Sequence, residues 1–301
     1  MTGKFFEELL SKSKAFNPEK INWFPGHMHK ATNDLTANLR SVDLFLEVRD
    51  ARLPLSSKNF EIDEALRMAQ KSKLILFNKY DLCNQRVTSQ AIEKFNSVGI
   101  NCLTISAKEG KNLEKLTNYL KQKQTIKYKT VGLWMMIGGM PNVGKSTIIN
   151  NLRESTISNK KAIAKATPLP CTTKKINGFK ISESPLAYLV DTPGIMVPKI
   201  LDNETGLKLA LVGCIREKIT GKEPLIEYMV WALNKLKVRA YVDFYGMTGI
   251  AKTAEELVFH CREKYKQFNY ETTYDMILKD FRDGKLGKVS LDDLDFLKEQ
   301  E

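Results

Sequence analysis

The chain has 301 residues, 43% of them hydrophobic, which excludes wholesale disorder and allows one large α/β domain with a smaller one. No apolar run approaches the ~20 residues of a membrane-spanning helix, so any association with a membrane is expected to be peripheral. The five cysteines are odd in number and lack metal-ligand spacing, which favours reduced thiols in a cytosol-like or matrix-like compartment.

Charge is distributed unevenly along the chain. The formal net charge is +12, and residues 1–200 carry 31 lysines and arginines against 17 acidic residues, whereas residues 201–301 carry 16 against 18. A basic front part predicts a polyanionic partner, with nucleic acid as the first candidate. A solvated surface without a partner is the alternative.

The N-terminal stretch gives weaker signals. Residues 1–16 mix lysines with acidic and hydrophobic residues, whereas a transit peptide is typically poor in acids, so this segment is a poor candidate for one. His27 and His29 follow a predicted turn at Pro25, but no third ligand is near, which disfavours a metal site there.

A base-recognition motif follows the second predicted strand. Strands are expected over residues 42–50 and 74–77, with a helix over about 59–71 between them. The second strand ends in Asn78, Lys79 and Asp81, an N-K-x-D pattern at the edge where open α/β sheets place ligand contacts. A carboxylate can accept from both N1–H and the 2-amino group of guanine, whereas adenine offers neither donor. Asp81 therefore predicts guanine, although Asn and Asp are also plain turn formers.

A second motif belongs to the same base site. After a helix near residues 88–98, a strand over residues 101–105 ends in Ser106, Ala107 and Lys108. In GTPases this tripeptide packs against guanine, and its backbone N–H bonds the base oxygen. A helix is expected next, over residues 112–123.

The run from Gly139 to Thr147 fits the phosphate-loop pattern G-x-x-x-x-G-K-[ST], between an apolar strand over residues 131–137 and the start of a helix. Backbone N–H groups and a helix N-terminus can hold phosphates there. Lys145 is expected to reach the terminal phosphates, and the Ser146 hydroxyl to bind Mg²⁺. A glycine-rich turn without a ligand is the alternative. The predicted phosphate-binding residues in this run are Asn142, Val143, Gly144, Lys145, Ser146 and Thr147.

A lysine-rich stretch over residues 153–180 surrounds Thr172 and Thr173. We expect a switch threonine here that contacts Mg²⁺ and the terminal phosphate, with Thr172 preferred and Thr173 left open. The lysines fit either a nucleotide-sensitive RNA contact or a solvated loop.

The last motif is D-x-x-G. A strand over residues 186–190 delivers Asp191 and Gly194. Asp191 is expected to hold Mg²⁺ through water, and the Gly194 N–H to sense the γ-phosphate.

The motifs run in the order N-K-x-D, S-A-K, phosphate loop, threonine loop, D-x-x-G, which resembles the circularly permuted GTPases. The phrase at residues 22–28, NWFPGHM, resembles their YlqF/RbgA-type ribosome-assembly branch. The stretches at residues 204–211 and 181–186 are similar to its mitochondrial members. The resemblance covers about residues 20 to 290.

The resemblance implies a fold and a domain organisation. It implies an N-terminal extension over residues 1–20 and a circularly permuted, Ras-like α/β P-loop GTPase domain over residues 21–200. A small all-helical domain with a short tail is implied for residues 201–301, where apolar residues recur at helical spacing.

The resemblance also implies how hydrolysis is completed. Ras-like enzymes orient the attacking water with a glutamine after D-x-x-G, and Ile195 cannot do so. The resemblance implies that His27 replaces this glutamine as the catalytic residue; its alternative role is to hold the turn after Pro25. The domain alone is therefore expected to hydrolyse GTP slowly. In related GTPases with P-N-x-G-K-S the asparagine helps to hold K⁺, which implies a potassium site at Asn142. Residues 170–172 read Pro-Cys-Thr, where relatives usually have Pro-Gly-hydrophobic-Thr, and the loss of that glycine keeps the choice between Thr172 and Thr173 open.

The implied function is a GTPase that binds the maturing large ribosomal subunit, contacts rRNA and ribosomal proteins, and leaves after hydrolysis. Magnesium and potassium are the implied cofactors, and a monomer without a DNA partner is expected. The implied compartment is the mitochondrial matrix, with peripheral contact with the inner membrane allowed and a bacterial-type cytoplasm as the alternative. A GTP-gated RNA-binding module and a GTPase acting in translation or tRNA modification are the competing interpretations.

Overall fold

The computed structural model describes residues 33, 35–123, 132–157, 167–168, 177–183, 186–191, 202–267 and 269–293. The predicted roles of His27, Thr172 and Gly194 lie outside these residues. Asp191 is described through its backbone alone, as the last residue of a strand.

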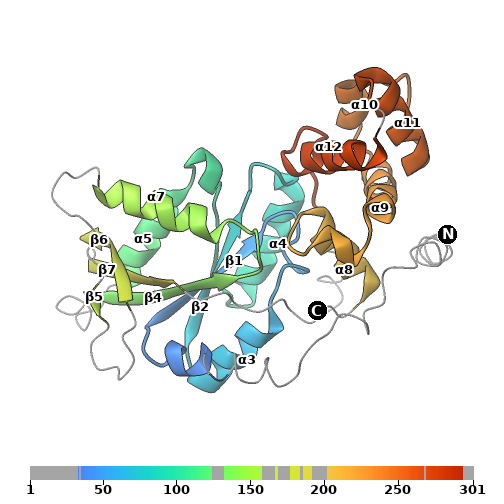
Figure 1. Ribbon diagram of the computed structural model, residues 1–301. Helices are drawn as coiled ribbons and strands as arrows, with labels where there is room; N and C mark the ends of the chain where they lie inside the picture. Colours follow the sequence, from blue (N-terminus) through green and yellow to red (C-terminus); the bar gives the residue numbers. More distant parts are fainter. Residues whose placement is uncertain are drawn as a thin grey trace.

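A mixed sheet forms the centre of the described part of the chain (Figure 1). Its strands are β1 (Leu44–Asp50), β2 (Ser72–Asn78), β3 (Cys102–Thr104), β4 (Leu133–Gly139), β5 (Thr167–Pro168), β6 (Asn177–Glu183) and β7 (Leu186–Asp191). The spatial order is β3-β2-β1-β4-β7-β6-β5. The strands from β3 to β7 in this order pair in parallel, whereas β6 and β5 add an antiparallel edge. The five strands predicted from the sequence are therefore the parallel ones.

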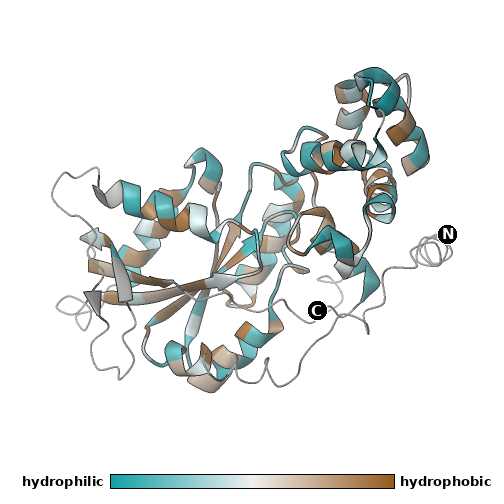
Figure 2. Cartoon of the chain, viewed as in Figure 1, coloured by the Kyte–Doolittle hydropathy of each residue, from teal (hydrophilic) through white to brown (hydrophobic). Residues whose placement is uncertain are grey.

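Helices cover both faces of the parallel strands, which explains why β1 and β4 are buried along their whole length. The helices are α3 (Phe60–Ala69), α4 (Gln85–Ser97), α5 (Leu113–Lys123) and α7 (Lys145–Ile157). Because side chains alternate along a strand, Phe45 packs with α3 while its neighbour Leu46 packs with α5 and α7. Figure 2 shows the hydrophobic residues concentrated in these central strands.

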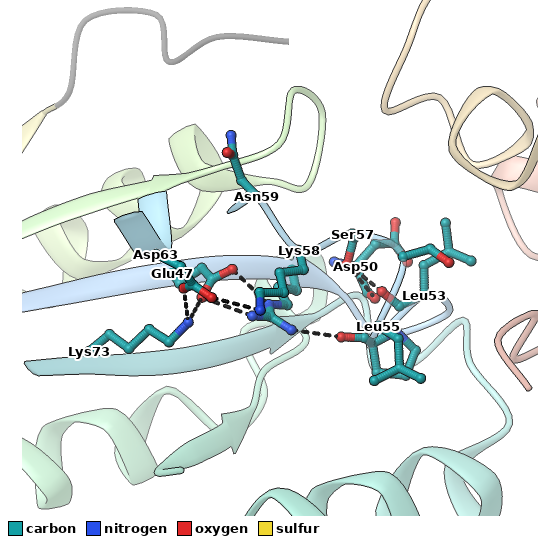
Figure 3. Close-up of polar contacts among 12 residues, drawn as sticks. Glu47, Asp50, Leu53, Leu55, Ser57, Lys58, Asn59, Asp63 and Lys73 are labelled. Carbon is teal, nitrogen blue, oxygen red and sulfur yellow. Dashed lines mark hydrogen bonds and ion pairs between the residues drawn. The ribbon is translucent and has the colours of Figure 1, made fainter. Parts of the chain in front are cut away.

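One buried ion-pair network interrupts the apolar strands. Arg49 donates to Glu47 at 2.8 Å, and Lys73 donates to Glu47 at 2.7 Å (Figure 3). Burial raises the pKa of Glu47, but Arg49 and Lys73 outweigh this effect, so the pKa lies below its ordinary value. The carboxylate therefore stays ionised inside the sheet layer.

The C-terminal part is helical, as predicted. It contains α8 (Asn203–Leu211), α9 (Lys222–Lys235), α10 (Ala240–Tyr245), α11 (Ala254–Tyr265) and α12 (Tyr270–Arg282). Helices α9, α11 and α12 pack against one another, and α8 lies between them and the sheet (Figure 1). The apolar positions at helical spacing, such as Leu225, Met229 and Leu233, are buried. No helix within the described ranges is long and apolar enough to cross a membrane.

The cysteines that the structure describes are buried and unbonded to one another. Burial raises the pKa of Cys83 and Cys102 to about 11, and that of Cys214 and Cys261 to about 12. These thiols are therefore protonated and unreactive at neutral pH, in line with the reduced state expected from the sequence.

Candidate functional site: a nucleotide pocket

The loop between β4 and α7 needs glycine at two positions. Gly139 has φ +140°, and a Cβ on it would lie 2.1 Å from the carbonyl oxygen of Val48 in β1. Gly144 has φ +96°, and a Cβ there would lie 2.2 Å from Asn78 Nδ2. Both glycines of the phosphate-loop pattern are thus required by close neighbours as well as by backbone conformation.

Lys145 lies folded over this loop. Its ammonium donates to the carbonyl oxygens of Gly139 at 2.9 Å and Met140 at 2.6 Å. Ser146 and Thr147 follow at the start of α7 and line the same cavity as Lys145. A positive charge, a helix N-terminus and a hydroxyl converge here, which suits phosphate groups and the Mg²⁺ that accompanies them.

Asn78 joins three motifs that are far apart in the sequence. Its Nδ2 donates to the carbonyl oxygen of Val143 at 2.8 Å, and its Oδ1 accepts from the N–H of Ala107 at 3.0 Å. Asn151 in α7 donates to the carbonyl oxygen of Ala107 as well. The base motifs and the phosphate loop are therefore held at a fixed separation.

Asp81 lies on a turn after β2 that the neighbouring motif supports. Its N–H donates to Ser106 Oγ at 3.1 Å, and the N–H of Tyr80 donates to the carbonyl oxygen of Ile105 at 3.2 Å. The Asp81 Oδ1 atom is buried and has no hydrogen-bond partner among the described residues. A buried acceptor left unpaired costs about 1–3 kcal/mol, which the N1–H of a bound guanine would offset. The site therefore fits guanine.

Asp50, at the end of β1, holds Lys79. The Lys79 ammonium lies 3.0 Å from Asp50 Oδ2, and Arg52 donates to the same carboxylate at 2.8 and 2.9 Å. Burial raises the pKa of Asp50, but Arg52 and Lys79 outweigh this effect, so the pKa lies well below its ordinary value. Asp50 was not among the residues predicted from the sequence, although it ends a strand at the same edge as Asn78.

Most of the motif residues line one cavity of about 800 Å³, within the size range of ligand pockets, whereas Val143, Ser106 and Ala107 are not among its lining residues. Residues from the end of α12 and the segment after it line the same cavity. They could not be predicted from the sequence, because they carry no local pattern. The lining residues are Asn78, Lys79, Asp81, Leu82, Lys108, Glu109, Asn142, Gly144, Lys145, Ser146, Thr147, Arg282, Asp283 and Lys288.

Asn142 connects the phosphate loop to the helical part. It has φ +56°, and its Nδ2 donates to the carbonyl oxygen of Gly213, just after α8, at 2.8 Å. The side-chain oxygen can still serve as a cation ligand.

The order of strands and motifs identifies the class of protein. The loop after β2 that carries the N-K-x-D motif, residues 78–84, is called the guanine loop. It precedes the phosphate loop after β4 in the chain, yet both loops open into one pocket at the carboxyl ends of parallel strands. This is the fold and site of a circularly permuted GTPase.

Comparisons with known proteins agree. The RsgA GTPase family model matches residues 54–201. Mitochondrial ribosome-associated GTPase 1 of Mus musculus is 31% identical over 90% of this chain and 89% of its own length. Ribosome biogenesis GTPase A of Bacillus pumilus is 34% identical over 90% of this chain and 98% of its own length. Short integuments 2, mitochondrial, of Arabidopsis thaliana is 40% identical over 71% of this chain, which spans 57% of that protein.

A solved structure supports the fold. The GDP-bound structure of TM YlqF matches 86% of this chain and 98% of its own, with a TM-score of 0.60 and 23% identity. The chain belongs to the circularly permuted GTPase family that includes mitochondrial ribosome-associated GTPase 1 and ribosome biogenesis GTPase A, and it is a GTP hydrolase. The fold class and the family expected from the sequence are confirmed.

Proposed function

We propose that this GTPase acts in mitochondria on the maturing large ribosomal subunit and couples GTP hydrolysis to a late assembly step and its own release. The names of the mouse and Bacillus relatives support a ribosomal partner, and the mouse and Arabidopsis names support the compartment. The observation that carries the nucleotide part is the buried, unpaired Asp81 Oδ1 in the same pocket as Lys145.

The described residues bind and orient GTP. Asp81 and Lys79 hold the guanine, the backbone of the phosphate loop and Lys145 hold the phosphates, and Ser146 binds Mg²⁺ together with the predicted ligands Thr172 and Asp191. When bound, Mg²⁺ neutralises charge on the transferring phosphoryl group.

His27 is the proposed catalytic residue, since Ile195 cannot orient water. An imidazole within reach of the attacking water can orient it through either ring nitrogen. The intrinsic rate is consequently low until the ribosomal subunit completes the site. Potassium held at Asn142 adds positive charge beside the phosphates.

The D-x-x-G motif and the phosphate loop both connect the nucleotide site to the helical part. Gly194, the proposed sensor of the γ-phosphate, lies nine positions before the start of α8 at Asn203 in the sequence, and the segment after α8 contacts the phosphate loop through Gly213 and Asn142. A change at the γ-phosphate can therefore be passed to the helices that would contact rRNA.

Co-sedimentation tests this function. Mitochondrial lysate is fractionated on a sucrose gradient with a non-hydrolysable GTP analogue or with GDP. We expect the protein to travel with the large subunit only in the GTP-like state, and Asp81→Asn to abolish this through loss of guanine binding. Migration with the small subunit or with free tRNA, or the same distribution in both nucleotides, would overturn the proposal.

A further inference from the structure

A segment beyond α12 leaves the helical part and lies across the guanine loop. The N–H of Val289 donates to the carbonyl oxygen of Leu82 at 3.2 Å. The hydroxyl of Ser290 lies 2.9 Å from Thr88 Oγ1 and 3.3 Å from the carbonyl oxygen of Asn84. These contacts hold the turn just after Asp81 and the first residues of α4.

The same segment has a second attachment at the loop after β1. The N–H of Leu291 donates to the carbonyl oxygen of Arg52 at 2.9 Å. The Asp292 carboxylate accepts from the backbone N–H groups of Leu55 at 2.7 Å and Ser56 at 2.9 Å. The four residues from Val289 to Asp292 are between 2 and 8% exposed, so the segment is part of the packed structure.

Asp81 therefore lies on a turn that is supported from two sides. On one side, Ser106 and Ile105 bond its backbone and that of Tyr80. On the other side, the carbonyl oxygen of Leu82 accepts from the N–H of Val289. The Leu82 side chain also packs closely on Gly284, where an added Cβ would lie 2.6 Å from Leu82 Cδ2.

We propose that residues 287–292, the C-terminal strap, are a positioning element for guanine recognition. The strap fixes the turn so that both oxygens of Asp81 meet guanine, one at N1–H and one at the 2-amino group. Ser290 is its central positioning residue, because its hydroxyl joins the strap to the start of α4, at the N-cap residue Asn84 and at Thr88. The strap also brings Lys288 to the wall of the nucleotide pocket.

The alternative is that the strap only stabilises the fold. The two roles differ in base selectivity. Inosine nucleotides lack the 2-amino group and make one of the two bonds to Asp81, so a misplaced carboxylate weakens guanine binding more than inosine binding. Loss of stability alone weakens both nucleotides by the same factor.

The experiment measures dissociation constants of GDP and IDP for the full chain and for Ser290→Ala. Thr220→Ala is the matched control, since Thr220 is a buried hydroxyl residue like Ser290 but lies in the helical part, where its hydroxyl bonds the carbonyl oxygens of Glu217 and Gly221. We expect Ser290→Ala to weaken GDP binding about three- to tenfold and to lower the preference for GDP over IDP, as expected for a lost hydrogen bond and a displaced carboxylate.

The control should leave the preference unchanged, and Asp81→Asn should remove it. If Ser290→Ala lowers the melting temperature far more than Thr220→Ala, Thr88→Val tests the same contact from the other partner, although it also removes the bond from the Thr88 hydroxyl to the carbonyl oxygen of Ala51 at 3.1 Å. An unchanged GDP-to-IDP preference in a folded Ser290→Ala or Thr88→Val protein would overturn the proposal. The result is independent of the ribosomal partner, because only nucleotide binding is measured.

Discussion

The side-chain amide of Asn78 donates to the carbonyl oxygen of Val143 at 2.8 Å, across 65 positions of sequence. Asn78 is 2% exposed, and its other amide atom is used by Ala107. One buried side chain thus sets the distance between the guanine loop and the phosphate loop, which a bound nucleotide must span.

Asn78→Ala should weaken GTP and GDP binding at least about tenfold, because it leaves a buried N–H and a buried carbonyl unpaired, at about 1–3 kcal/mol each. Nucleotide titration measures this. Gln90→Ala, which removes an exposed amide from α4, is the control and should have no effect. Unchanged affinity in a folded Asn78→Ala protein would show that the two hydrogen bonds of Asn78 are not needed for nucleotide binding.

Gly139→Ala should lower the melting temperature markedly. The new Cβ would lie 2.1 Å from a backbone oxygen of the central strand β1, at a φ of +140°. Backbone strain and overpacking of this kind cost about 1–3 kcal/mol each. Gly249→Ala is the matched control, since a Cβ there has nothing within 4 Å. Equal melting temperatures for the two variants would contradict the packing described here.

Local patterns were sufficient to predict much of this molecule. Apolar runs predicted the parallel strands, and each motif is a short stretch whose chemistry is visible in its own residues. The two antiparallel strands β6 and β5 were missed, because they lie in or beside the lysine-rich stretch and contain no apolar run. The strap and the contact between Gly213 and Asn142 were missed because they depend on pairings between distant segments, which no local pattern encodes.

Potassium should accelerate GTP turnover relative to sodium at equal ionic strength. In the structure the side-chain nitrogen of Asn142 donates to the carbonyl oxygen of Gly213, so its side-chain oxygen can still bind a cation. Asn142→Ala should make the two rates equal while GDP affinity stays close to that of the wild type. Asn142→Asp keeps an oxygen ligand and should retain part of the potassium effect. Equal rates of the wild type in both salts would rule out the potassium site.

Acid should destabilise the protein through Asp50 and Glu47. Their folded pKa values lie below the ordinary ones, so their contribution to stability is present above the unfolded pKa of about 4 and is lost as pH falls further. The melting temperature should stay nearly level from pH 7 to 5 and then fall.

Asp50→Asn should flatten this acid slope. It should also cost about 3–5 kcal/mol at pH 7, because Arg52 and Lys79 lose their buried counter-charge. Asp275→Asn, at an exposed ion pair with Lys222, is the control and should change little. An Asp50→Asn protein with an acid slope as steep as that of the wild type would contradict this assignment.

GTP turnover with purified ribosomal particles tests the central claim most directly. Large subunits, but not small subunits or free tRNA, should accelerate turnover, and His27→Ala should remove this acceleration while GTP affinity is kept. Turnover that no particle stimulates would contradict the ribosomal function, and stimulated turnover that survives His27→Ala would contradict the catalytic role of His27.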